Sequence, residues 1–146
     1  MVKTLTMSDR DLVTAVIQLA NLLNRRLTPT FEKVRVTPQQ WAVLSALSEY
    51  DQPTTLASLA KRLLVTKQNM TGMITRLADL GLVDRNDDPH DLRSSRVELT
   101  RRGRGVVEKL RPAYEEWRNT LSREISERDL QTVQRVLDSL IDKLEV

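Results

Sequence analysis

The stretch that decides the interpretation of this chain, residues 66–81, reads TKQNMTGMITRLADLG. Apolar side chains recur at positions 70, 73, 74, 77 and 80, which is the spacing of an amphipathic helix. Thr66 is a favourable N-cap residue, and Gly81 stands where a helix commonly ends. The stretch therefore predicts a helix over residues 67–80 with one buried face.

The opposite face of this helix has the side chains expected of a helix in a DNA major groove. Gln and Asn pair with adenine, Arg and Lys with guanine or phosphate, and the small Thr and Gly permit close approach. No acidic residue follows until Asp79, whereas an ordinary solvated face, the alternative interpretation, mixes acidic and basic groups. The candidate contacts are Thr66, Lys67, Gln68, Asn69, Thr71, Thr75 and Arg76.

The segment before it predicts a short helix over residues 56–63, capped by Thr55. Two short helices joined by three or four residues form a helix-turn-helix arrangement. Thr55 and Lys61 are candidates for contacts to the DNA backbone. Further upstream, Thr37 followed by Pro38 predicts the start of another helix, with Trp41, Val43, Leu44 and Leu47 on its buried side and its end at residues 51–53.

The segment after it changes to a period of two. Strands are expected at residues 82–85 and 96–99, around a polar turn at 86–91, and together they form a hairpin or wing. Asp91 and Arg93 lie two residues apart, so on an extended strand both project to one side and the carboxylate can orient the guanidinium. An Arg held at a hairpin tip suits a narrow minor groove. The alternative is a surface ion pair worth roughly 0 to 1 kcal/mol.

Both ends of the chain predict long helices. One begins at a Ser8–Asp11 capping-box pattern, and Pro29 should kink it or mark its fraying end; two more start at Thr100 and Ser126, with a kink expected at Pro112. Their apolar faces are wide enough for burial on two sides, which favours a dimerisation bundle, although packing within one chain is the alternative. The candidate dimerisation residues are Leu12, Val16, Leu19, Leu23, Leu110, Trp117, Leu137, Leu140, Ile141 and Leu144.

Composition narrows the functional class of this chain of 146 residues. With no Cys and a single histidine, His90, it offers neither a disulfide nor a Cys/His metal cage, and we expect no metal and no cofactor. Residues 52–105 contain ten basic and six acidic groups, a surplus of +4, while the rest of the chain sums to −1. A basic middle segment suits an anionic partner.

An enzyme is not expected, because the sequence contains no Gly-rich phosphate loop and no paired carboxylates in an apolar setting. It also lacks the roughly 20 apolar residues of a membrane span and the apolar core of a secretory signal. We therefore expect an intracellular, cytoplasmic protein that does not bind a membrane.

Five short motifs in this order resemble the MarR family of bacterial and archaeal transcription regulators. They are TPQQWAVL at 37–44, LA at 59–60 with VTKQNMT at 65–71, LGLVDR at 80–85, DLR at 91–93 and VELTRRG at 97–103. The resemblance implies a homodimer that binds a pseudo-palindromic operator, with the recognition helix in the major groove and the wing Arg in the minor groove. It matches at Asp91 and Arg93 and departs at Gly72, where many relatives have a bulky or charged residue.

The resemblance also implies a repressor that releases DNA when a phenolic or other small aromatic anion binds between the dimer bundle and the DNA-binding lobe. The expected fold class is mainly α with a small β-hairpin wing (α+β). Residues 1–146 form a single domain, with a winged helix-turn-helix at 36–105 and dimerisation segments at 8–34 and 106–146. The rival hypothesis is a protein-interaction module that uses the same scaffold without reading DNA.

Overall fold

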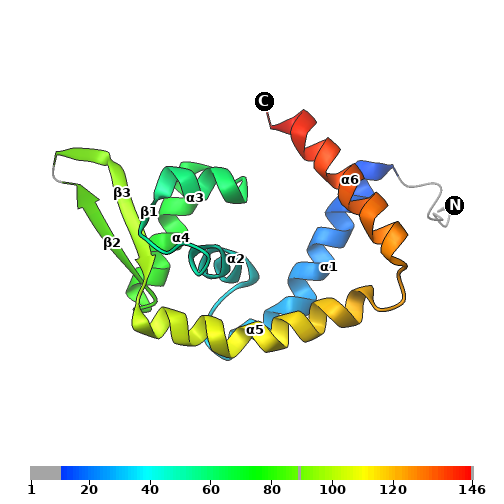
Figure 1. Cartoon of the computed structure of the whole chain (residues 1–146), viewed down its shortest axis with the longest axis horizontal. Coiled ribbons are helices and arrows are strands. Elements are labelled where there is room, and N and C mark those ends of the chain that lie inside the picture. Colours follow the sequence, from blue (N-terminus) through cyan, green and yellow to red (C-terminus); the bar gives the residue numbers. More distant parts are fainter. Residues whose placement is uncertain (1–10, 89, 146) are drawn as a thin grey trace, which may run out of the picture. The chain divides into compact units, whose positions relative to one another are not determined.

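The computed structural model describes residues 11–88 and 90–145, apart from the side chains of residues 88 and 91–94. The chain divides into two compact units, residues 1–110 and 111–146, with the boundary inside α5. The observed class, mainly helical with a small wing, confirms the prediction. The elements are α1 (Leu12–Glu32), α2 (Pro38–Leu47), β1 (Thr54–Thr55), α3 (Leu56–Leu63), α4 (Lys67–Asp79), β2 (Val83–Asp88), β3 (Asp91–Leu99), α5 (Arg101–Ser122) and α6 (Glu127–Leu144) (Figure 1).

Side-chain caps set most of the helix starts, as predicted. Thr37 Oγ1 accepts from Gln40 N at 3.1 Å, and Gln40 Oε1 accepts from Thr37 N at 3.0 Å, which completes a capping box. The same type of bond, to the amide three residues on, is made by Thr55, Thr66, Thr100 and Ser126. Each cap satisfies an amide that the first helical turn would otherwise leave unpaired.

Three expectations for the ends of α1 and α2 need correction. The N-cap of α1 is Asp11, whose Oδ1 accepts from Thr14 N at 2.7 Å, while Ser8 lies outside the described residues. Helix α1 continues past Pro29 to Glu32, so Pro29 does not mark its end, although proline removes one backbone donor; whether it kinks α1 stays a prediction. Helix α2 ends at Leu47, before the predicted stop at 51–53, because the amides of Glu49 and Tyr50 bond three residues back instead of four.

The core of the first unit joins side chains from every element in it. Phe31 of α1 stacks on Trp41 of α2, with ring centroids 5.4 Å apart. The other fully buried large side chains are Val43, Leu44, Leu59, Met70, Ile74, Leu77 and Val97. Three of these, Met70, Ile74 and Leu77, belong to α4, so burial fixes which side of α4 faces solvent.

The sheet is larger than predicted. Its strand order is β1-β3-β2, and all pairs are antiparallel. No sequence pattern predicts β1, which pairs Thr54 with Val97, and the wing strands extend into residues assigned to the turn. Cross-strand pairing, such as Asn86 opposite Arg96, stabilises polar segments that have no apolar alternation of their own.

The two helices of the helix-turn-helix each end at a residue in the left-handed conformation, and the two residues differ in type. Gly81, with φ of 75°, follows α4, and the bonds Gly81 N to Ala78 O and Leu82 N to Leu77 O make a Schellman motif, as its glycine predicts. At the end of α3 the same role falls to Leu64, with φ of 57° and 53% exposure. The turn between the two helices is therefore fixed by backbone bonds and not by a glycine.

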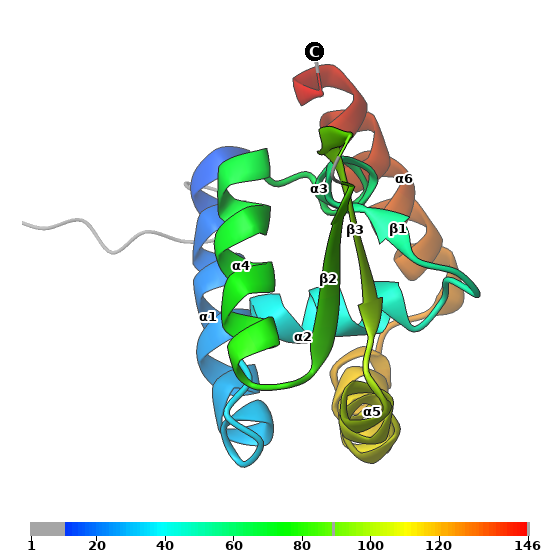
Figure 2. The ribbon, with the colours of Figure 1, turned by 90° about the vertical axis from the view of Figure 1, so that its left-hand side faces the viewer.

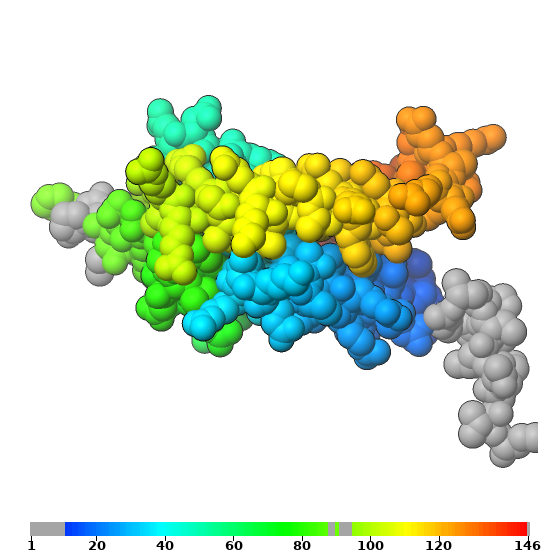
Figure 3. All heavy atoms as spheres, turned by 90° about the horizontal axis from the view of Figure 1, so that it is seen from below, coloured from blue at the N-terminus to red at the C-terminus, as the bar shows by residue number. Residues whose placement is uncertain are grey.

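The start of α5 packs on the turn after α4. Thr100 Oγ1 donates to Gly81 O at 2.7 Å, Thr100 N donates to Leu82 O at 3.1 Å, and Gly103 is buried. Beside it, a hollow of about 260 Å³ is bordered by basic side chains of the α1–α2 turn and α5, Lys33, Arg35 and Arg102. Figure 3 shows this side of the first unit, where the start of α5 lies next to the end of α1.

Candidate nucleic-acid interface

Helix α4 displays its polar face along the edge of the first unit. Met70, Ile74 and Leu77 are 0% exposed, while Lys67, Gln68, Asn69, Thr71, Thr75 and Arg76 are all exposed. Figure 2 shows α4 beside the hairpin of β2 and β3, with α2 crossing behind them. The structure therefore brings six of the seven predicted helix contacts to one open face, and the seventh, Thr66, is exposed at the cap.

The threonines of this helix have limited freedom to donate. Thr66 Oγ1 accepts from Asn69 N at 3.0 Å, while Thr71 Oγ1 donates to Lys67 O and Thr75 Oγ1 donates to Thr71 O, each at 2.9 Å. With their protons used inside the helix, Thr71 and Thr75 offer outward only a methyl group and acceptor lone pairs. Donors to a partner must therefore come from the hydroxyl of Thr66 at the cap or from the long side chains, Lys67, Gln68, Asn69 and Arg76.

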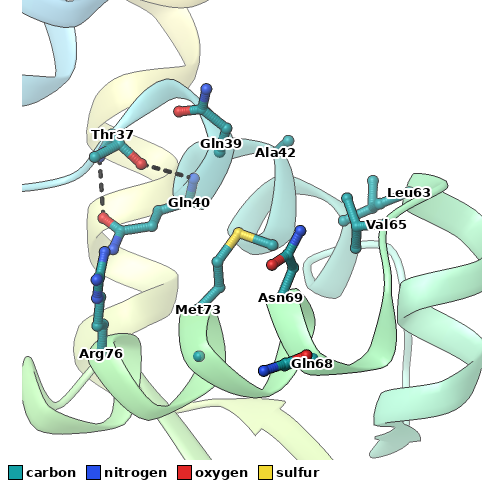
Figure 4. A pocket seen from close by; sticks show the side chains of 11 residues that line it. Thr37, Gln39, Gln40, Ala42, Leu63, Val65, Gln68, Asn69, Met73 and Arg76 are labelled. Atoms are coloured by element: carbon teal, nitrogen blue, oxygen red, sulfur yellow. Dashed lines mark hydrogen bonds between the residues drawn. The ribbon is translucent and has the colours of Figure 1, made fainter.

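A groove between α2 and α4 borders this face. Its volume is about 560 Å³, with Ala42, Val65 and Met73 among its apolar residues and Gln39, Gln68 and Arg76 among its polar ones. In Figure 4, Asn69 and Met73 point from α4 into the groove, and Arg76 points toward Thr37 and Gln40 at the start of α2. Arg76 is thus both exposed on the polar face of α4 and part of the groove lining, so it can contact a partner in front of α4 or a ligand in the groove.

The two residues proposed for DNA backbone contact lie at the N-cap and in the last turn of α3. Thr55 caps this helix and its hydroxyl donates to Ser58 Oγ at 2.9 Å, whereas Lys61 is exposed in the last turn. Its neighbour Arg62 pairs with Glu49, and its guanidinium lies 5.3 Å from the centre of the Tyr50 ring. Arg62 therefore ties α3 to the end of α2, which leaves Lys61 as the freer cation.

The wing contains a polar network that the sequence did not reveal. Arg85 Nε donates to Asp87 Oδ1 at 3.0 Å, and the Ser95 hydroxyl of β3 donates to the same oxygen. The Ser95 bond and then the Arg85 guanidinium hold the pKa of Asp87 below its ordinary value. The signal was present, since Arg85 and Asp87 are two residues apart on a strand, but it required β2 to extend past residue 85.

The side chains of Asp91 and Arg93 lie outside the described residues, so their pairing stays a prediction. Their backbones belong to β3, not to a turn, and this satisfies the extended geometry that the pairing requires.

The proposed dimerisation residues fall into three groups. Leu12, Val16 and Leu19 of α1 and Leu137, Ile141 and Leu144 of α6 are 40 to 84% exposed. Leu23, Trp117 and Leu140 are half-buried. Leu110 is only 5% exposed, so it belongs to the core of the chain and offers a partner almost nothing.

Sequence reasoning missed the part of α2 that lines the groove. Gln39 donates to Asn24 Oδ1 of α1 at 3.0 Å and also borders the groove, as do Thr37 and Gln40. The capping box at 37–40 was recognisable, but its position beside α4 depends on how α2 packs. No group of three or more metal-binding side chains occurs among the described residues, and no helix there is long and apolar enough to cross a membrane.

Comparison with known proteins gives consistent matches. The family model described as MarR family matches residues 36–94. Transcriptional activatory protein BadR of Rhodopseudomonas palustris is 42% identical over 98 residues, which cover 64% of this chain but only 54% of that relative. The uncharacterized HTH-type transcriptional regulator Mb0904 of Mycobacterium bovis is 34% identical over 140 residues, which cover 91% of this chain and 92% of that relative.

A solved structure shows that the fold is shared along most of the chain. The complex of MepR from S. aureus with DNA matches 92% of this chain and 98% of that one, with a TM-score of 0.84 and 21% identity. At this identity the likeness concerns the fold alone.

Proposed function

Because this chain belongs to the MarR family of winged helix-turn-helix transcription regulators, we propose that it binds an operator as a homodimer, with α4 in the major groove and the wing in the minor groove. The family consists of regulators and not enzymes, as the sequence predicts. One recognition helix per subunit requires a two-fold symmetric site with half-sites roughly 10 base pairs apart.

The observation that carries the proposal is the solvent face of α4. Three fully buried side chains fix the helix rotation, and the face that remains presents Gln68, Asn69 and Arg76 without an acid before Asp79. Amide and guanidinium groups form the bidentate contacts by which base edges are read. Lys67, at the first turn, is suited to a phosphate, where the helix dipole also favours an anion.

The apolar faces of α1 and α6 support the homodimer. Six large apolar residues of α1 are 41 to 67% exposed, and no described residue of α6 is buried. Soluble monomers rarely expose contiguous apolar surface on this scale. A second copy of the chain covers these faces, and an isologous contact gives the two-fold symmetry that the operator requires.

The regulator acts as a repressor that a small aromatic or phenolic anion releases. Repression needs only occupancy of the operator, whereas activation needs a further surface for the transcription machinery. The groove between α2 and α4 supports release, because an aromatic acid against Met73 would have its carboxylate near Arg76, one turn further along α4, and would block the reading face. Transcription in vitro, with and without salicylate, tests both the sign of regulation and release.

Replacing Lys67 and Gln68 by alanine, one at a time, should separate phosphate contact from base reading. We expect Lys67→Ala to weaken binding to all sequences alike and to lower the salt slope by about 1, because a phosphate contact releases counterions. We expect Gln68→Ala to cost about 1 to 3 kcal/mol at the operator and to relax preference at one position per half-site. Fluorescence anisotropy measures both effects, with DNA that flanks the gene encoding this protein as the ligand and with binding repeated at increasing salt concentration.

Arg104 is an exposed basic residue of α5, and the Arg104→Ala variant serves as a control for the loss of one positive charge. If affinity of the unmodified protein stayed flat between about 50 and 200 mM salt, phosphate binding would be excluded and the protein-interaction module would become the better hypothesis. A sequence-selective effect at Lys67 would reverse the two assignments.

The wing is tested by a double-mutant cycle of Arg93→Ala and Asp91→Ala. Loss of Arg93 should cost about 1.5 to 3 kcal/mol of operator affinity, the range for hydrogen bonds to charged groups, and loss of Asp91 should cost less. If Asp91 acts only by orienting Arg93, the double variant binds no worse than Arg93→Ala alone. Tighter binding by Asp91→Ala would refute the orienting role and leave only repulsion between the carboxylate and phosphate.

A further inference from the structure

Gly72 occupies the centre of the solvent face of α4. It lies two positions after Met70 and two before Ile74, so at about 100° per residue its side-chain position points about 160° away from each of theirs. Because both of those side chains are 0% exposed, position 72 is directed straight out of the first unit. It is therefore the position on α4 that a partner in front of the helix would meet first.

The fold itself gives no reason for a glycine there. Glycine inside a helix is less stable than alanine, because its backbone loses more freedom on folding. Gly81 has a positive φ, and a Cβ on Gly103 would lie 2.0 Å from Leu82 O, so the structure explains both. At Gly72 a Cβ meets nothing within 4 Å, and φ is not positive. Whatever a side chain would obstruct at this position lies outside the chain.

The neighbours of Gly72 indicate what approaches it. Gln68 lies one turn before it and Arg76 one turn after it, at the i−4 and i+4 positions of the same stripe. All three residues border the groove, and Gly72, between the two long side chains, presents no side chain of its own. A planar polar group that contacts both side chains at once would also contact the backbone of α4 at position 72.

We propose that Gly72 is a specificity-determining residue, whose missing side chain lets the backbone of α4 rest against the edge of a base pair in the major groove. This inference rests on the proposed DNA-binding function. Close approach at the centre of the helix brings Gln68 and Arg76 within reach of the bases on either side. A side chain at position 72 would keep α4 farther from the bases. It would therefore weaken the contacts of Gln68 and Arg76 with the bases at a specific site, and leave nonspecific binding unchanged.

Gly72→Ala tests the proposal because the expected changes in stability and in binding have opposite signs. Alanine should raise the melting temperature by about 2 to 4 °C, since the helix gains propensity and no clash occurs. It should weaken binding about tenfold or more at a duplex that the wild-type protein selects from a random-sequence library. Binding to an unselected duplex of equal length should stay the same, and Gly72→Leu should enlarge the specific loss.

Gly105→Ala is the matched control, because Gly105 is also helical, exposed and without any atom within 4 Å of an added Cβ. It should stabilise the protein similarly and leave both affinities unchanged. Specific affinity equal to wild type in Gly72→Ala and Gly72→Leu, or an equal loss at both duplexes, would overturn the role of Gly72. Failure of the wild-type protein to enrich any sequence would instead overturn the proposed function, so the two failures are distinguishable.

Discussion

Replacing Gly103 by alanine is expected to destabilise the chain by about 3 kcal/mol, the upper end of the range for overpacking. The added Cβ would lie 2.0 Å from Leu82 O and 3.2 Å from Leu99 Cδ2. No rotamer change relieves the first contact, because Leu82 O is a backbone atom that already accepts from Thr100 N at 3.1 Å. The first turn of α5 must therefore move away from the turn between α4 and β2.

The midpoint of urea unfolding, followed by circular dichroism, measures this loss. Gly105→Ala, two residues along the same helix, is again the control, and it should raise stability by about 0.5 to 1 kcal/mol. A Gly103→Ala protein with the wild-type midpoint would show that the close packing of α5 on the α4–β2 turn is not required. A loss of this size is a large fraction of the stability of a small domain, about 5 to 15 kcal/mol.

The second large effect is expected from charges on the apolar face of α6. Leu137 and Ile141 are one turn apart and each 40% exposed. The double variant Leu137→Arg with Ile141→Arg should be monomeric, because each dimer would bury four unpaired charges. Operator affinity should fall by about 10² to 10⁴, since each monomer engages one half-site without the advantage of linkage.

Light scattering at low micromolar concentration gives the oligomeric state, and anisotropy gives the affinity. The matched control is Gln131→Arg with Ser139→Arg, which adds the same charge to the polar side of α6, where both residues are exposed. It should remain dimeric. A wild-type chain that scatters as a stable monomer, or a dimeric Leu137→Arg, Ile141→Arg variant, would refute the proposed interface.

Local patterns in the sequence predicted all the helices and the class of the fold. The caps at Thr37, Thr55 and Thr66 and the stop at Gly81 were readable because each of their bonds spans three to five residues. The buried side of α4 followed from periodicity for the same reason. Hence the candidate recognition face was identifiable before any tertiary contact was known.

The remainder depended on contacts between distant segments. Strand β1 exists because Thr54 pairs with Val97, 43 positions along the chain, and two threonines alone have no strand pattern. The wing extends because β3 supplies partners, including Ser95 for Asp87, to a polar stretch that resembles a turn. No local pattern reports such bonds, since the free energy that stabilises them comes from the partner strand.

The sequence by itself therefore determined which side chains α4 offers to a partner, because a helix repeats every 3.6 residues whatever surrounds it. Only the tertiary structure separated the helical glycines Gly72 of α4 and Gly103 of α5 by role. Gly103 is required by a backbone oxygen of the α4–β2 turn, whereas Gly72 has open space in front of it. It also assigned Leu110 to the core, while Leu137 and Ile141 remain exposed. A repeating pattern marks an apolar face, but what covers that face depends on the packing of segments far apart in the chain.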